Sequence, residues 1–112
     1  MKKDNIAFAD FMKLDMRVGE VVEAGLVENS RNLIKLTVDL GVDYGQVIIL
    51  SGIAKWYSPA DLVGNKYIFL ANLQPKQIMG MLSNGMILVV DNEEKPVLIE
   101  LSKDFINGQI VR

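Results

Sequence analysis

The stretch Leu33-Ile-Lys-Leu-Thr-Val-Asp-Leu40 decides the fold, because apolar and polar side chains alternate along it from residue 34 on. Its even-numbered residues are all apolar, whereas Lys35, Thr37 and Asp39 lie between them. Successive side chains of a strand point to opposite faces, so this pattern predicts a half-buried antiparallel strand. The next segment, Gly41 to Gly45, supplies a turn in which both glycines are free to take positive φ.

Further strands are predicted on both sides of this one, at residues 18–27, 46–50, 67–71, 86–90 and 97–101, with residues 109–111 at an edge. The segments 46–50 and 67–71 are apolar on both faces. Both faces must then be covered, by a helix, by a barrel interior or by a partner chain. Phe8, Phe11 and Met12 have the spacing of a short helix, and Ser58-Pro59 followed by Asp61 predicts the start of another.

Five or more short strands with a helical insertion favour a closed barrel, because a flat sheet leaves two edges exposed. We predict an all-β fold, a five-stranded Greek-key barrel of the OB type, with a sandwich as the alternative. In OB folds the second and third strands and the flanking loops bind oligonucleotides. Lys35 and Thr37 would then lie on the binding face, with Arg31 at its edge.

Composition limits the possible functions. The length of 112 residues predicts a single domain, 1–112, and no apolar run is long enough to span a bilayer. The chain has neither cysteine nor histidine, so it offers no disulfide framework and no thiolate or imidazole metal ligand. It also lacks a glycine-rich phosphate loop, so an enzyme is the weaker hypothesis, and we expect no metal site and no cofactor. A cytoplasmic location fits this composition. The net charge is −2, yet residues 31–88 hold five basic and three acidic residues, which fits either a local anion-binding face or ordinary surface charge.

The connection between the strands at 67–71 and 86–90 is a candidate binding loop. Pro75 ends the first strand, and Gly80 and Gly85 flank a tight passage whose tip we expect at Ser83 and Asn84. Met79 and Met81 are interpreted as core residues, whereas Ser83 and Met86 remain open between core and contact roles. Trp56 and Tyr57 have rings that stack on bases in some proteins, but core packing is the stronger interpretation for Trp56.

From Asp10 onward, which is nearly its whole length, the sequence resembles a known protein family. The motifs that carry the resemblance are Asp10-Phe11, Lys13, Asp15, Arg17-Val-Gly19, 33–41, Ser51-Gly-Ile-Ala54, Tyr57-Ser-Pro59, Leu62-Val-Gly64, Ala71-Asn-Leu73, Pro75-Lys76, Met79-Gly80 and Ser83-x-Gly85-Met86-Ile-Leu88. Each is weak alone, but their order and spacing are specific. The chain resembles the tRNA-binding domain at the C-terminus of bacterial methionyl-tRNA synthetases. It is similar also to free-standing structure-specific tRNA-binding proteins and to the endothelial monocyte-activating cytokine.

The resemblance implies an OB fold with terminal extensions that form a homodimer. It implies binding of tRNA by shape, without catalysis, in a chain that is free-standing or belongs to a methionyl-tRNA synthetase. It places Ser83 and Met86 on a tRNA-contacting loop. The tRNA-binding residues that we expect from the resemblance and from side-chain chemistry together are Arg31, Lys35, Lys55, Lys76, Ser83, Asn84 and Met86. Asn32 and Gln77 stand where the family commonly has basic residues.

The alternative function comes from a chaperone-like relative in the same superfamily that is linked to protein export. This alternative predicts that the chain binds peptides with an affinity that does not depend on salt concentration and is unchanged by Lys76→Glu. The intact Ser83-x-Gly85-Met86 motif favours the tRNA-binding branch.

Overall fold

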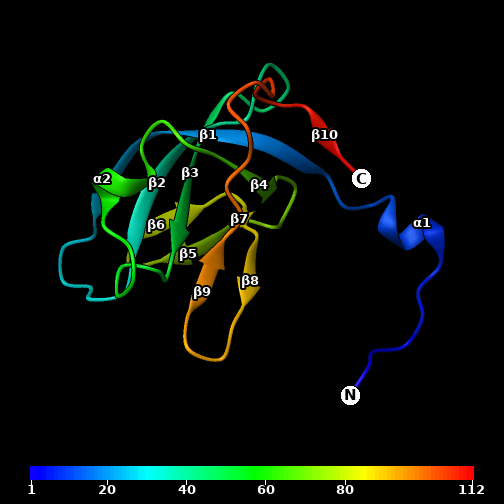
Figure 1. The fold of residues 1–112 in the computed structure, drawn as a ribbon, viewed down its shortest axis with the longest axis horizontal. Coiled ribbons are helices and arrows are strands. Elements are labelled where there is room, and N and C mark those ends of the chain that lie inside the picture. Colours follow the sequence, from blue (N-terminus) through cyan, green and yellow to red (C-terminus); the bar gives the residue numbers. More distant parts are fainter.

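A computed structural model describes the whole chain, Met1–Arg112, and shows a nearly closed five-stranded antiparallel barrel (Figure 1). The strand order is β3-β2-β1-β4-β7, and the last strand, β10, pairs with the start of β1. The five barrel strands are β1 (Met16–Leu26), β2 (Ile34–Asp39), β3 (Gln46–Ser51), β4 (Lys66–Leu70) and β7 (Met86–Ile87), and the additional strand β10 spans Ile110–Val111. The predicted OB-type barrel is therefore confirmed.

The remaining elements are short. Two hairpins stand outside the main sheet, β5 (Lys76–Ile78) with β6 (Met81–Ser83), and β8 (Val89–Asp91) with β9 (Pro96–Leu98). The helices are α1 (Phe8–Phe11) and α2 (Pro59–Leu62). Both predicted helices are present, and α2 begins with the expected capping box from Ser58 and Asp61. None of the helices has the length and apolar character needed to cross a bilayer.

β1 is the long strand around which the sheet is built. It pairs with β2 through residues 20–26, with β4 through residues 16–20, and with β10 through residues 16–17. The register between β1 and β2 shifts between Val21 and Glu23, which is a β-bulge, and bulges bend a strand as a closing barrel requires. Glycine is needed on β1 at residue 19, because a Cβ there would lie 2.7 Å from side-chain atoms of Phe69 and Val38.

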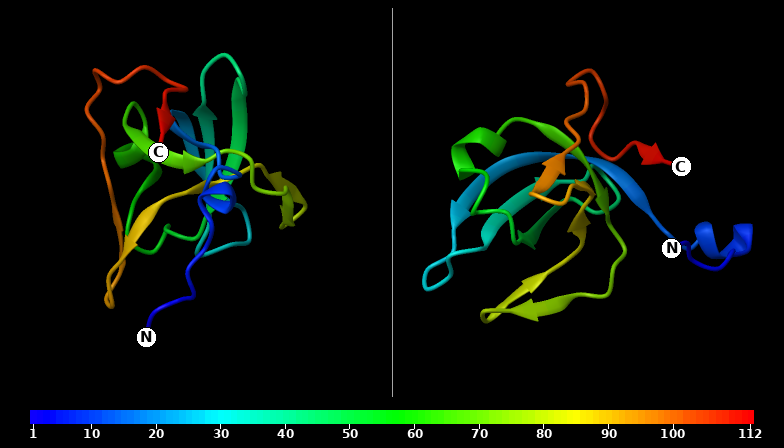
Figure 2. Two further views of the ribbon diagram at one scale, coloured as in Figure 1. Left: turned by 90° about the vertical axis from the view of Figure 1, so that its right-hand side faces the viewer. Right: turned by 60° about the horizontal axis from the view of Figure 1, so that its bottom comes forward.

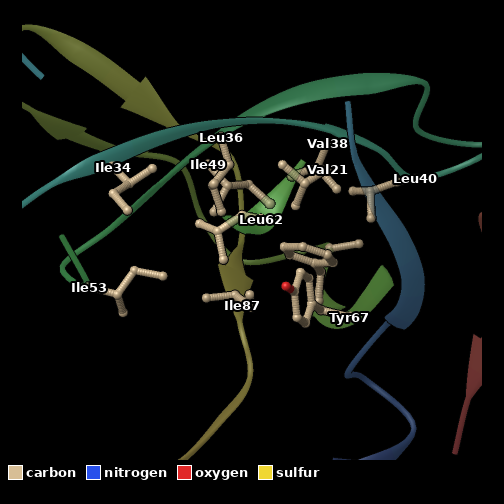
Figure 3. Close-up of a cluster of buried hydrophobic side chains, with 12 residues drawn as sticks. Val21, Ile34, Leu36, Val38, Leu40, Ile49, Ile53, Leu62, Tyr67 and Ile87 are labelled. Carbon is tan, nitrogen blue, oxygen red and sulfur yellow. The ribbon is translucent and has the colours of Figure 1, made fainter. Parts of the chain in front are cut away.

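The core fills the barrel interior with twelve buried apolar side chains (Figure 3). They are Val21, Ile34, Leu36, Val38, Leu40, Ile49, Ile53, Leu62, Tyr67, Phe69, Ala71 and Ile87. The rings of Tyr67 and Phe69 meet edge to face with centroids 6.5 Å apart, a favoured aromatic geometry. Burial raises the pKa of the Tyr67 hydroxyl. The even-numbered residues of the 33–40 stretch all point inward, as the alternation predicts.

The two strands that are apolar on both faces are covered in different ways. On β3, Leu50 is buried although it is not part of the core cluster, and β3 lies against β6 and β7. On β4, the outward residue Ile68 is only half-buried and lines an open apolar groove with Val18, Leu101 and Phe105. A single chain therefore covers the outward face of β3 with its own strands, whereas it leaves the outward face of β4 accessible.

Several predicted boundaries need correction. The strand expected at 86–90 is two strands, because β7 pairs with β4 whereas β8 turns away to pair with β9. The strand expected at 97–101 ends at Leu98, and Leu101 keeps only an isolated bridge to Lys66. The helix at Phe8 exists but buries no residue, and residues 1–12 extend away from the barrel on the side of β10 (Figure 1).

Candidate nucleic-acid interface

A row of paired residues across four strands connects two of the candidate cations. Lys35 on β2 pairs with Leu50 on β3, and the Leu50 N–H donates a hydrogen bond to the Ser83 hydroxyl, with 3.0 Å between the nitrogen and Oγ. Ser83 on β6 pairs in turn with Lys76 on β5. The register therefore connects Lys35, Ser83 and Lys76 across neighbouring strands instead of scattering them over the molecule.

Ser83 itself lies beneath the surface, which corrects the prediction that it forms the tip of the loop. Its side chain is 6% exposed, and its hydroxyl also reaches the Gly85 carbonyl oxygen at 3.4 Å. The tip is the two-residue turn Met79-Gly80, since Ile78 pairs with Met81. With its hydroxyl committed to the backbone, Ser83 holds the hairpin against β3 and has no free donor for a phosphate.

Asn84 continues the same contact with β3. Its backbone N–H donates to the carbonyl oxygen of Ile48 at 2.8 Å, and its side-chain amide reaches the Leu82 carbonyl oxygen at 3.5 Å. The residue is partly exposed, so its amide remains accessible to a ligand.

Arg31 and Lys55 lie on two segments that contact each other. Arg31 is in the loop between β1 and β2, and Lys55 is in the turn after β3. The Ala54 N–H donates to the Asn32 carbonyl oxygen at 2.9 Å, which joins the two segments. The Lys55 ammonium lies 5.6 Å from the ring centroid of Trp56, a residue that is 39% exposed and outside the core cluster. The core interpretation of Trp56 is therefore wrong.

All four candidate cations, Arg31, Lys35, Lys55 and Lys76, are exposed and free of ion pairs. The three ion pairs of the molecule involve Lys13 and Arg17 instead. An exposed ammonium or guanidinium without a carboxylate partner has its N–H donors available for an external anion. Charge on phosphates supplies most of the affinity in nucleic-acid complexes, so these positions have the chemistry that an RNA backbone requires.

The methionines of this region are more exposed than the sequence suggests. Met79 is 53% exposed and Met86 is 45% exposed, while Met81 is half-buried. The interpretation of Met79 as a core residue is wrong, because it lies at the turn of a hairpin that projects from the barrel. The sequence carried no signal for that turn, since the Asn-Gly and Asp-Gly pairs that mark such turns are absent there.

The strongest electrostatic network lies at the other end of β1, around Arg17. The guanidinium of Arg17 hydrogen-bonds Asp15, Asp43 and the Gly108 carbonyl oxygen. The hydrogen bond from Arg17 lowers the pKa of Asp15, and the same bond raises the pKa of Arg17. The hydrogen bond that the Tyr44 hydroxyl donates to Asp15 raises the pKa of Tyr44. These shifts come from contacts that join β1 to two loops, and they belong to the scaffold.

The chain contains no group of three or more acidic, histidine or cysteine side chains positioned to hold a metal ion.

Comparison with known families identifies the architecture. Residues 16–110 match the family model described as "Putative tRNA binding domain". The chain belongs to the tRNA-binding domain family. The matched residues run from the first residue of β1 into β10, so they include the whole barrel and both hairpins.

Among curated relatives of this tRNA-binding domain is the methionine–tRNA ligase of Clostridium acetobutylicum, which is 45% identical over 112 residues. The alignment covers 98% of this chain but only 17% of the ligase. The chain thus spans about one sixth of the length of the curated relatives that it matches.

Solved structures confirm the fold. A MetRS-related protein from Pyrococcus horikoshii superposes with a TM-score of 0.92 at 34% identity, covering 98% of this chain and 100% of that one. The chaperone CsaA from Bacillus anthracis superposes with a TM-score of 0.84 at 29% identity, covering 97% and 100% of the two chains.

Proposed function

We propose that this domain binds tRNA without catalysing a reaction, through the face that carries Arg31, Lys35, Lys55 and Lys76. The match of residues 16–110 to the tRNA-binding domain family is the observation that carries the proposal. The unpaired cations supply its physical basis, because contacts to phosphates fix position and affinity without reading sequence. Asn84, which follows β6, and Met86, on β7, are accessible next to the hairpin β5–β6 and serve as auxiliary contacts.

The likeness to methionine–tRNA ligases supports a role beside a synthetase catalytic region, in the same chain or in a separate one. The domain would then hold tRNA while another region carries out aminoacylation. This tRNA-binding function would be carried out in the cytoplasm, together with the other proteins of translation.

The test is a salt titration of tRNA binding, followed by anisotropy of a fluorescein-labelled tRNA. Three to four phosphate contacts predict a slope of log K against log salt of roughly −3 to −4. Lys35→Ala and Lys76→Ala should each weaken binding to all tRNAs alike and make the slope shallower by about 1. Lys103→Ala is the matched control, because Lys103 is an exposed lysine in the loop between β9 and β10 and is not one of the four candidate cations. A slope near zero for the unaltered protein would contradict the proposal.

We also propose that the domain is a homodimer formed through its terminal segments. Exposed apolar side chains gather there, with Phe8 75% exposed and Ile110 55% exposed. Beside them lies the open apolar groove of about 530 Å³ over β4, lined by Ile68 and Phe105. Exposed apolar surface of this kind is typical of association sites.

Sedimentation velocity tests the dimer. Phe8→Ser should shift the protein toward the monomer, since it removes an apolar side chain from the terminal segment. Val42→Ser is the control, because Val42 is fully exposed in the turn between β2 and β3. Equal monomer fractions for the two variants would contradict this interface.

A second candidate function is peptide binding, which the likeness to the chaperone CsaA favours. Binding of a fluorescein-labelled unfolded peptide, measured in the same anisotropy assay, distinguishes this function from tRNA binding. Binding of the peptide that is unchanged by salt and by Lys76→Glu would favour this function over tRNA binding.

A further inference from the structure

A groove between two projecting segments lies beside Lys35. One wall is the end of β1 and the loop that follows it, and the other is the hairpin β5–β6; both project on the same side of the barrel (Figure 2). The groove has a volume of about 400 Å³, and its lining is Leu26, Val27, Glu28, Asn29, Lys35, Met79 and Met81. This volume lies within the range of about 300–1,000 Å³ that is usual for small-molecule sites.

The hairpin tip at this groove has an unusual residue in a demanding conformation. Met79 and Gly80 form a two-residue turn with φ values of 51° and 79°, which is the signature of a type I′ turn. The first position of such turns strongly favours asparagine, aspartate or glycine, and a methionine in the left-handed region is strained. Neither the turn nor the core explains the methionine, because the side chain is 53% exposed. What Met79 adds is apolar, polarizable surface at the rim of the groove.

The groove combines this surface with one free cation. Lys35 is exposed and has no carboxylate within 4.0 Å. No atom lies within 4 Å of a Cβ added at Gly25, which pairs with Lys35, so the sheet surface beside the lysine is open. Glu28, in the loop that follows β1, repels phosphate but accepts N–H groups from the edge of a base. The lining is thus polarised, with an anion-binding side at Lys35 and an apolar wall at Met79 and Met81.

One nucleotide of RNA has the matching chemistry. A methionine thioether packs well on aromatic rings, and proteins insert methionine and other apolar side chains at base steps. In folded RNA the available bases are those of loops, bulges and ends, where they are not held in a stack. We propose that this groove captures one unstacked nucleotide of a folded RNA, with its base against Met79 and Met81 and its phosphate on Lys35. The inference rests on the proposed function and adds a local feature that the domain selects within the RNA.

The test compares two fluorescein-labelled RNA hairpins that differ only by a single-nucleotide bulge, using anisotropy at fixed salt. The unaltered protein should bind the bulged hairpin at least about fivefold more tightly, and Met79→Asn should remove this preference. Asparagine followed by glycine is the favoured type I′ pair, so this variant keeps the hairpin while losing the apolar side chain. Leu82→Ala is the matched control, since Leu82 is an exposed apolar residue of the same hairpin (54%) that does not line the groove. This control should keep the preference.

A second measurement places 2-aminopurine in the bulge, where its fluorescence reports the surroundings of the base. The fluorescence should change on binding to the unaltered protein and not on binding to Met79→Asn. Equal affinity for the two hairpins, or a bulge preference that survives Met79→Asn, would overturn the inference. If tRNA still binds with the expected salt slope in that case, only the nucleotide site is wrong. If neither tRNA nor either RNA hairpin binds, both the proposed tRNA-binding function and the nucleotide site are wrong.

Discussion

Replacing Ser83 by alanine should destabilise the barrel without removing a direct contact to RNA. The Ser83 hydroxyl is the acceptor for the Leu50 N–H, on the edge of β3 that faces away from β2. Alanine at residue 83 leaves this donor buried without a partner. The cost of an unsatisfied buried polar group is about 1–3 kcal/mol.

That cost converts into a shift of the melting temperature. Unfolding entropy near 60 °C is about 2.1 cal/mol/K per residue, or roughly 0.24 kcal/mol/K for a chain of 112 residues. One kcal/mol then corresponds to about 4 °C, so we expect Ser83→Ala to melt about 4–13 °C lower. The assay is thermal unfolding followed by Trp56 fluorescence, at one fixed protein concentration because any association makes the melting temperature depend on concentration.

Ser102→Ala is the control for this measurement. Its hydroxyl accepts a hydrogen bond from the Asp104 N–H at an exposed turn, where water replaces a lost partner. This variant should stay within about 0.5 kcal/mol of the unaltered protein. If Ser83→Ala melts like the control, and tRNA affinity measured well below the melting temperature falls sharply, then Ser83 is a contact residue and the structural argument is refuted.

Two other predictions concern stability. Because the hydrogen bond from Arg17 lowers the pKa of folded Asp15, this pair contributes stability above the unfolded pKa of about 3.9 and loses it as the pH falls through the folded value. The urea midpoints of Asp15→Asn and the unaltered protein should therefore differ at pH 7, and the difference should shrink as the pH falls below about 3.9; a constant gap would contradict this linkage. Gly19→Ala should cost about 1–3 kcal/mol by overpacking against Phe69, whereas Gly25→Ala meets no atom within 4 Å and should cost far less in the same urea titration. Similar midpoints for the two glycine variants would show that the barrel relaxes around residue 19.

Patterns that depend on neighbouring residues were predictable from the sequence. The alternation at Ile34–Asp39 predicted β2 and its inward face, and Ser58 with Asp61 predicted the start of α2. These signals are local, since strand periodicity and capping each need only a few consecutive residues. The closed barrel followed from the number of strands and from the need to protect their edges.

The binding loop was less predictable, because its shape depends on distant residues. Ser83 looks like a loop-tip residue in the sequence, but the open edge of β3 requires a hydrogen-bond partner for Leu50, and only the fold shows that Ser83 provides it. The turn at Met79-Gly80 lacks the usual composition of type I′ turns, so the hairpin β5–β6 was missed. The groove beside Lys35 was missed for the same reason.

The long strand β1 also sets an order of assembly. Its partner β2 follows it directly in the chain, and β3 follows β2, so these three strands associate by closing short loops only. By contrast, Arg17 meets Ile110 near the other end of the chain, a contact that closes a very long loop. Nonlocal pairings of this kind slow folding, because loop-closure entropy opposes them until other contacts have formed. We therefore predict that the chain folds around its first meander, and that β10 is the last strand to dock and the first to open when amide hydrogen exchange is measured.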